Sequence, residues 1–107
     1  GMTMEETVYF TELYDSYHGL LTDRQDSMLA LYYEEDYSLA EIAEHYDISR
    51  QAVRDNIRRG QKAMEDYESR LHINAKRKKR RNLLLDLLNE TNQETIEALL
   101  EIDGDVL

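Results

Sequence analysis

A set of polar and basic side chains in the middle of the chain has the chemistry to bind a nucleic acid. Arg can donate two hydrogen bonds to guanine and Gln can pair similarly with adenine, while either can hold a phosphate instead. If residues 49–62 are helical, Gln51, Arg54, Arg58 and Lys62 lie within about a third of a turn of one another. The candidate contact residues are Ser49, Arg50, Gln51, Arg54, Arg58, Arg59, Lys62, Lys76, Arg77, Lys78, Lys79, Arg80 and Arg81.

The segment that must position the first of these residues, about 38–59, is typical of a helix-turn-helix. Ser38 and Glu41 form a capping box, and Ser49 can cap a second helix eleven residues later. Ala43 is the small residue that allows the two helices to approach closely. Asp47 stands where many such motifs have Gly, and Asp tolerates left-handed geometry better than most residues. The alternative is an ordinary helical hairpin with a charged exterior.

The second helix of this motif is expected to continue beyond Arg59. Apolar or small residues recur at alternating spacings of four and three, which is a short heptad pattern. This seam consists of Val53, Ile57, Gly60, Met64, Tyr67 and Leu71. It could pair with a second copy of the chain or pack against the chain's own first helix. We favour packing within the chain, because sustained coiled coils need three or four heptads.

The remaining pattern predicts an all-α fold of five to six helices with a long fourth helix. The chain has 107 residues, no proline and only four glycines, which indicates a single helical domain over 1–107. A first helix is expected from about Met4 to His18, closed by Gly19. A second is expected from Thr22, capped with Gln25, to about Asp36. Seven of the eight tyrosines precede residue 50, and we interpret most as half-buried core rings rather than base-stacking platforms.

The extension over about 76–107 combines a basic run with a leucine cluster. Lys76–Arg81 could be a solvated helix face or a phosphate-binding surface, and like charges this close oppose helix formation unless acidic groups screen them. The apolar residues that follow could fold back onto the core or form a homodimer interface, and we favour the homodimer. This cluster consists of Leu83, Leu84, Leu85, Leu87 and Leu88, and Asn92 is expected to cap a last helix.

Charge is distributed unevenly along the chain, whose net charge is −10. Residues 1–48 carry −11, residues 49–81 carry +8 and residues 82–107 carry −7. Positive charge is therefore concentrated where the candidate contact residues lie. The acidic flanks repel polyanions and weaken non-specific binding. These observations predict a selective or assisted binder rather than a general nucleic-acid coat.

Catalytic chemistry is not indicated. His18, His45 and His72 stand alone, without a second histidine or carboxylate at metal-ligand spacing. The sequence has no glycine-rich phosphate loop and no cysteine, and no nucleophile–base pair can be proposed. We therefore expect no enzyme activity, no metal and no cofactor. We also expect no membrane insertion, because no apolar run approaches spanning length.

The stretch LTDRQDSMLALYYEEDYSLAEIAEHYDISRQAVRDNIRR resembles the YlxM family of small bacterial helix-turn-helix proteins. The resemblance covers about two thirds of the chain, from the first helix to near Leu71, and is loose after residue 75. LYY followed by SRQAV is its most specific part. The same stretch is more distantly similar to sigma-factor region 4, which shares the S-R-x-x-V start of the recognition helix.

This resemblance implies a cytoplasmic, sigma region 4-like helical bundle and a regulatory role in the signal recognition particle pathway. It raises the particle's RNA, its GTPase and the GTPase's receptor as partners beside promoter DNA. Three hypotheses follow: a DNA-binding regulator, an accessory factor that binds the particle's RNA, and a protein adaptor that only dimerises. We favour a nucleic-acid-binding regulator tied to this pathway, with the adaptor second.

Overall fold

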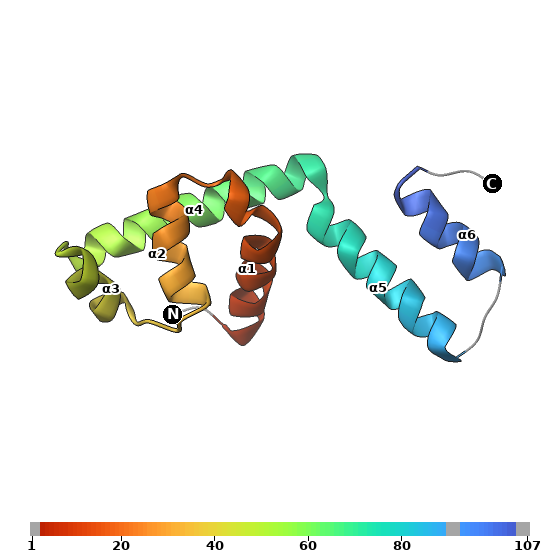
Figure 1. Ribbon diagram of the computed structural model, residues 1–107, viewed down its shortest axis with the longest axis horizontal. Helices are drawn as coiled ribbons and strands as arrows, with labels where there is room; N and C mark the ends of the chain where they lie inside the picture. The colour runs from red at the N-terminus through yellow and green to blue at the C-terminus, as the bar shows by residue number, and fades with distance from the viewer. Residues whose placement is uncertain (1–2, 90–92, 105–107) are drawn as a thin grey trace. The chain divides into compact units, whose positions relative to one another are not determined.

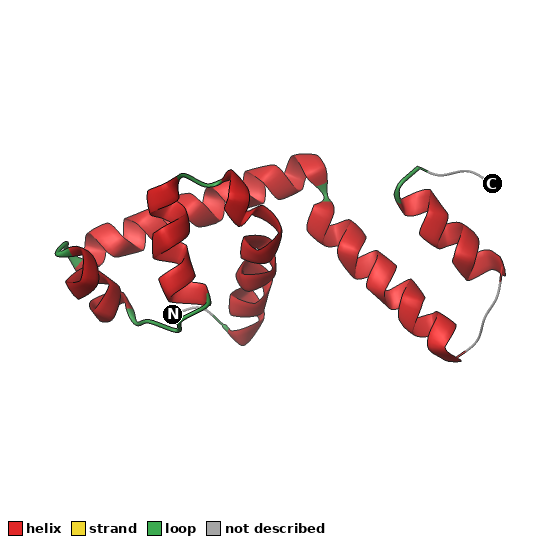
Figure 2. Ribbon diagram, viewed as in Figure 1, coloured by secondary structure: helices red, strands yellow, loops and turns green. Residues whose placement is uncertain are grey.

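The computed structural model describes residues 3–89 and 93–104, and these residues form helices and no strand (Figure 2). The expected all-α fold with a long fourth helix is confirmed. In chain order the helices are α1 (Met4–Tyr17), the short 3₁₀ helix η1 (His18–Leu20), α2 (Asp23–Tyr33), α3 (Leu39–Tyr46), α4 (Arg50–Leu71), α5 (Ile73–Asn89) and α6 (Gln93–Ile102) (Figure 1).

The helices fall into two compact units. The first, Gly1–Leu71, contains α1 to α4, and the second, His72–Leu107, contains α5 and α6. The expectation of one domain over residues 1–107 stays a prediction. The helix-turn-helix lies entirely in the first unit, whereas the basic run and the leucine cluster lie in the second.

Local hydrogen bonds set the starts of the first three α-helices. Thr3 caps α1, and both predicted capping boxes form, Thr22 with Gln25 and Ser38 with Glu41. The expected ends were less accurate. α1 ends at Tyr17 and passes into η1, where Gly19 needs no left-handed conformation. α2 ends at Tyr33 rather than near Asp36, because Asp36 has a φ of 56° and leaves the helical region.

Aliphatic and aromatic side chains from α1 to α4 meet in one buried core. Its members are Leu13, Tyr14, Tyr17, Met28, Leu29, Ile42, Ala43, Val53, Ile57 and Met64. Twelve partly buried aromatic and aliphatic side chains pack around them. Most tyrosines before residue 50 belong to this core or its edge, as expected from their spacing. The core determines how the four helices are held against one another.

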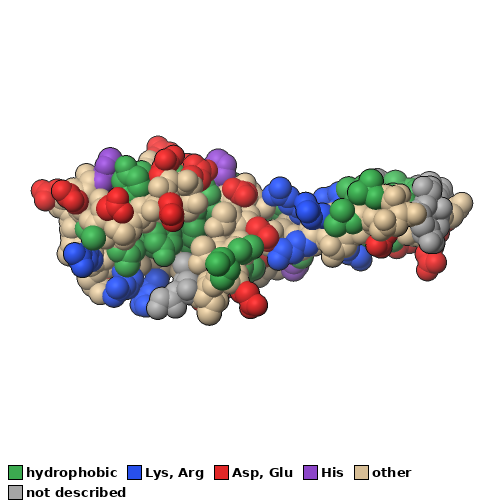
Figure 3. All heavy atoms as spheres, turned by 90° about the horizontal axis from the view of Figure 1, so that it is seen from below, with side chains coloured by type: hydrophobic (Ala, Val, Ile, Leu, Met, Phe, Trp, Pro, Cys, Tyr) green, Lys and Arg blue, Asp and Glu red, His purple; other side chains and the backbone are tan. Residues whose placement is uncertain are grey.

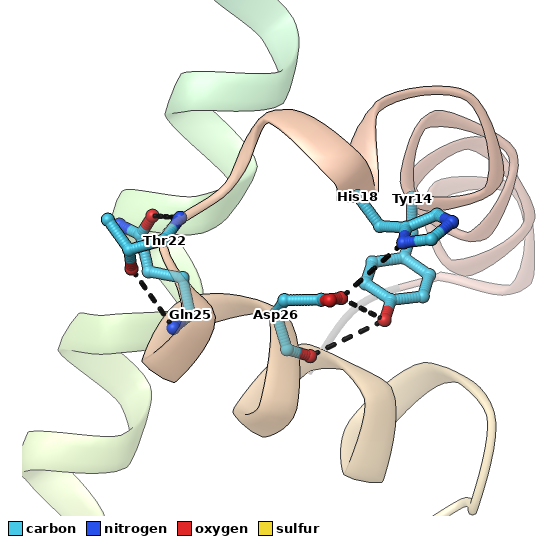
Figure 4. A network of polar contacts seen from close by, with 5 residues as sticks. All are labelled: Tyr14, His18, Thr22, Gln25 and Asp26. Carbon is cyan, nitrogen blue, oxygen red and sulfur yellow. Dashed lines mark hydrogen bonds and ion pairs between the residues drawn. The ribbon is translucent and has the colours of Figure 1, made fainter.

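A polar contact at the edge of the core ties α1 to α2. The Tyr14 hydroxyl donates to Asp26 Oδ1, and His18 Nδ1 lies 3.7 Å from the same oxygen (Figure 4). Burial first and the Asp26 carboxylate second raise the pKa of Tyr14 well above its ordinary value of 10.0. The phenol is therefore neutral at physiological pH and acts as a donor.

Most of the apolar seam of α4 packs within the chain, as favoured from the sequence, whereas Leu71 at its end is 45% exposed. Val53, Ile57, Gly60 and Met64 are buried, and Tyr17 of α1 stacks near Tyr67 with ring centroids 6.0 Å apart. α2 is a second partner, because a Cβ built on Gly60 would lie only 2.8 Å from Leu29 Cδ2. Gly60 thus allows α4 to lie against α2, and the opposite face of α4 is left to solvent.

The second unit is an antiparallel pair, α5 and α6 (Figure 1). The basic run Lys76–Arg81 is helical, and an acidic residue of the same chain screens part of it, since Arg80 Nη2 lies 3.0 Å from Asp103 Oδ1. Leu83 and Leu87 are half-buried, whereas the other three leucines of the cluster are exposed. The expected cap, Asn92, lies outside the described residues.

Candidate nucleic-acid interface

The turn between α3 and α4 adopts the geometry expected of a helix-turn-helix. Asp47 has φ 54° and ψ 48°, so it supplies the left-handed residue that Gly supplies in many such turns. The Ile48 backbone N–H donates to the Ala43 carbonyl oxygen at 3.0 Å and closes the turn. Ser49 Oγ accepts from the Ala52 backbone N–H at 3.0 Å. These contacts close the turn and start α4 at Arg50.

The first four turns of α4 present the expected polar face. Ser49, Arg50, Gln51, Arg54, Arg58, Arg59 and Lys62 are all exposed. Val53 and Ile57 on the opposite side are 0% and 5% exposed, so packing fixes the rotation of the helix about its axis. The structure therefore places Gln51, Arg54, Arg58 and Lys62 on one side of α4, with Ser49 at its start, whereas Arg50 and Arg59 are exposed elsewhere around the helix. Their contact with a nucleic acid stays a prediction.

One acidic residue, Asp55, lies among these basic residues. Gln51 Nε2 donates to Asp55 Oδ1 at 2.9 Å, one turn further along α4. This contact orients the Gln51 amide along the helix and places a carboxylate on the same side of α4 as Gln51. A nucleic acid at this face would have to approach the Asp55 carboxylate as well as the arginines. Because the carboxylate repels phosphate, Asp55 favours selective over indiscriminate phosphate binding.

Figure 3 shows Lys and Arg side chains gathered at one edge of the first unit, while Asp and Glu are spread over other parts of the same face. The uneven charge seen along the sequence is thus also uneven in space. Positive charge concentrated on one face raises the local attraction for polyanions despite a net negative chain.

The second set of candidate residues, Lys76–Arg81, lies on α5 in the other unit. Five of the six side chains are exposed, and Arg80 is half-buried beside Asp103. Six basic residues in the first half of a helix destabilise that helix, because their charges repel one another and lie near the positive end of the helix dipole. A bound polyanion would relieve this repulsion, so the phosphate-binding interpretation stays a prediction for these residues.

A groove beside the outer face of α4 was not anticipated from the sequence. It has a volume of about 610 Å³ and is lined by the apolar residues Phe10, Tyr32, Leu39 and Ile57 and by Arg54 and Arg58. Glu6 and Gln61 complete its wall. These residues come from four helices separated by long intervals in the chain, and only the folded core brings them together. No local motif could have identified them.

Within the described residues, no group of three His, Asp or Glu side chains could hold a metal ion. None of the described helices is both long enough and apolar enough to cross a lipid bilayer.

Comparison with known proteins places the helix-turn-helix in a family. Residues 4–102 match a family model described as "Putative helix-turn-helix protein, YlxM / p13 like", UPF0122. The chain belongs to this family. The match extends to the end of α6, so the resemblance covers more of the chain than the two thirds expected, and the extension is part of the family's architecture.

Individual relatives agree with this assignment. The chain is 47% identical over 103 residues to the UPF0122 protein YofM of Lactococcus lactis subsp. lactis, covering 94% of this chain and 93% of the relative. It is 45% identical over 104 residues to a UPF0122 protein of Bacillus pumilus, with 94% of each chain covered. A UPF0122 protein of Streptococcus mutans is 54% identical over 72 residues, which cover 67% of this chain and 66% of the relative.

Proposed function

We propose that this protein is a non-enzymatic, nucleic-acid-binding regulatory protein that acts as an accessory to the signal recognition particle pathway. The observation that carries the binding function is the solvent face of α4. There a helix-turn-helix presents Gln51, Arg54, Arg58 and Lys62 in one stripe, while the opposite side of the helix is buried. This is the arrangement by which a recognition helix enters a major groove or follows a phosphate backbone.

The link to the signal recognition particle rests on the family resemblance alone. The particle's RNA is proposed as the ligand, with promoter DNA as the competing one, and the particle's GTPase or its receptor as a protein partner. Such a regulator would work in the cytoplasm. The acidic surface of the chain supports a selective interaction, because it opposes indiscriminate binding to polyanions.

A second candidate function is a protein adaptor that dimerises and does not bind nucleic acid. It is favoured by the exposed leucines of α5: Leu88 is 81% exposed and Leu84 50%. Arg77, Arg80 and Arg81 border the same surface, which forms a shallow apolar depression of about 450 Å³. A homodimer joined through this surface would cover leucines that the two-helix unit leaves in water.

Fluorescence anisotropy distinguishes these candidates. Labelled signal recognition particle RNA and a duplex DNA of equal length are titrated with the protein across a salt series. We expect RNA to bind more tightly, and Arg54→Ala with Arg58→Ala to weaken binding and to reduce the salt slope by about one per lost phosphate contact. Arg70→Ala, an exposed arginine at the far end of α4, is the matched control and should bind like the wild type.

Each alternative has its own result. A preference for DNA that survives unlabelled competitor would replace the RNA hypothesis with the transcriptional one. Stronger loss from neutral substitutions in Lys76–Arg81 than in α4 would move the interface to α5. Absence of binding to either nucleic acid at low salt would refute the proposal. The adaptor hypothesis would then predict that Leu84→Glu with Leu88→Glu converts a dimer to a monomer in sedimentation experiments.

A further inference from the structure

We infer that the groove beside α4 receives one unstacked nucleobase of the bound nucleic acid. This inference rests on the proposed function and adds to it a ligand class: a strand that carries an unpaired, extruded nucleotide. The groove lies entirely in the first unit and shares Arg54 and Arg58 with the recognition face of α4. A nucleic-acid backbone held by these two arginines would therefore run alongside the groove.

The apolar lining of the groove is suited to a flat aromatic ligand. It consists of Phe10, Tyr32, Leu39 and Ile57. Both aromatic rings are held by neighbours, since Tyr32 makes an edge contact with Tyr33 at 5.0 Å between centroids and Phe10 with Tyr9 at 5.1 Å. A base that stacks on a ring already fixed in place loses little side-chain freedom of the protein. Stacking of a base on an aromatic side chain is typically worth about 5- to 150-fold in affinity.

The charged and polar groups of the wall are arranged for a nucleotide rather than for an apolar ligand. Arg54 and Arg58 can hold the phosphates on one side. Gln61 is fixed by its Nε2, which donates to the Tyr33 hydroxyl at 2.8 Å. Burial raises the pKa of Tyr33 to about 12, so this hydroxyl keeps its proton at physiological pH.

Glu6 is the acidic side chain among the residues that line the groove. Its carboxylate repels a phosphate but can accept a hydrogen bond from a base, so we assign Glu6 to the base and the two arginines to the phosphates. A carboxylate accepts a hydrogen bond from an exocyclic amine such as cytosine N4 and has no such donor to meet at uracil O4. The groove should therefore prefer an extruded base that carries an amine.

An acidic amphipathic helix of a partner protein is the competing occupant, because it too could place apolar residues against the apolar lining and carboxylates near the arginines. The nucleotide fits better for two reasons. Glu6 opposes an acidic peptide, and two of the four apolar residues that line the groove are aromatic. The continuity of the groove with the recognition face also needs no additional partner.

The test compares RNA and DNA duplexes that are fully paired, that carry one bulged cytosine or that carry one bulged uracil. We expect the wild type to bind the bulged-cytosine form at least about fivefold more tightly than the paired form. Tyr32→Leu and, separately, Phe10→Leu should remove this preference and leave affinity for the paired duplex unchanged. Tyr37→Leu is the matched control, a half-buried tyrosine of the same unit outside the groove. Circular dichroism melting confirms that each variant is folded.

Two further measurements report on the groove directly. A bulged 2-aminopurine should lose fluorescence on binding to the wild type and lose less with Tyr32→Leu, because stacking quenches it. Glu6→Gln should reduce the preference for cytosine over uracil without changing paired-duplex affinity. RNA and DNA versions of each probe show which backbone the groove accepts.

Equal affinity for bulged and paired forms, or a preference that persists in both aromatic variants, would overturn the groove proposal and leave the proposed function intact. Loss of all nucleic-acid binding by the wild type would overturn both. Binding of an acidic helical peptide that depends on Tyr32, without any bulge preference, would assign the groove to a protein partner instead.

Discussion

Replacing Gly60 by Ala tests how the recognition face is positioned. In an exposed helix this change stabilises by about 1 kcal/mol, because Ala has the higher helix propensity. Here the added Cβ would lie 2.8 Å from Leu29 Cδ2 and 3.0 Å from Leu29 Cδ1. Leu29 is 0% exposed, so its side chain could give way only by displacing other groups of the packed core. Overpacking of this kind costs typically about 1–3 kcal/mol, so the expected net loss is about 1 kcal/mol.

Thermal unfolding followed by circular dichroism measures this loss. For a unit of this size a loss of about 1 kcal/mol lowers Tm by about 4–8 °C. Gly19→Ala is the matched control, since a Cβ there meets nothing within 4 Å, and it should not lower Tm. If Gly60→Ala raised Tm, α4 would not be in close contact with α2, and the packing argument for the orientation of α4 would be wrong.

A double-mutant cycle separates the steric effect from helix propensity. Leu29→Ala alone should cost about 2–5 kcal/mol through the cavity it leaves. In that background Gly60→Ala should stabilise, because the clash is gone and the gain in propensity remains. The sign of the Gly60→Ala effect should thus reverse, with a coupling of about 2 kcal/mol, within the range found for residues in contact. Additive effects would refute the contact.

Two other predictions concern the ends of α3. The Ser38 backbone N–H donates to Glu41 Oε1 at 3.0 Å, and this contact first, with the Ser38 side chain second, lowers the pKa of Glu41 below its ordinary value of 4.5. The stabilisation is present above that ordinary value and is lost as pH falls through the lowered pKa, so Tm of the wild type should fall more between about pH 7 and pH 3 than Tm of Glu41→Gln. Equal falls would contradict this linkage. Asp47→Gly removes the cost of a left-handed non-glycine residue and should raise Tm by a few degrees, whereas Asp47→Val should lower it, and the reverse order in the same melts would mean that the turn is not left-handed.

The sequence predicted the elements whose signals are local. Ser38, Glu41 and Ser49 mark helix starts through hydrogen bonds that span only three residues, and each of these bonds forms. The left-handed turn at Asp47 could be predicted because it depends on a single residue's conformational preference. Helix ends were harder. α2 stops three residues before its expected end, where no glycine or proline marks the boundary, and the chain must turn towards α3.

For the candidate site, the sequence by itself determined which face of α4 is polar, because helical periodicity separates Arg54 and Arg58 from Val53 and Ile57. It also determined the family, since the specific motif lies in one continuous stretch. It left open whether the seam of α4 met another copy or the chain itself. Packing decided this, because Leu29 and Tyr17, distant in sequence, fill the space around Gly60 and Tyr67.

Only the tertiary structure produced the groove. Its aromatic, apolar and charged residues are brought together by the burial of the core and share no common motif, so no pattern along the chain indicates them. Capping hydrogen bonds and helical periodicity depend on residues that are close together in the sequence, whereas a concave surface depends on how several helices pack. For this reason the chain's sequence determined its recognition helix, and the folded core decided what lies beside it.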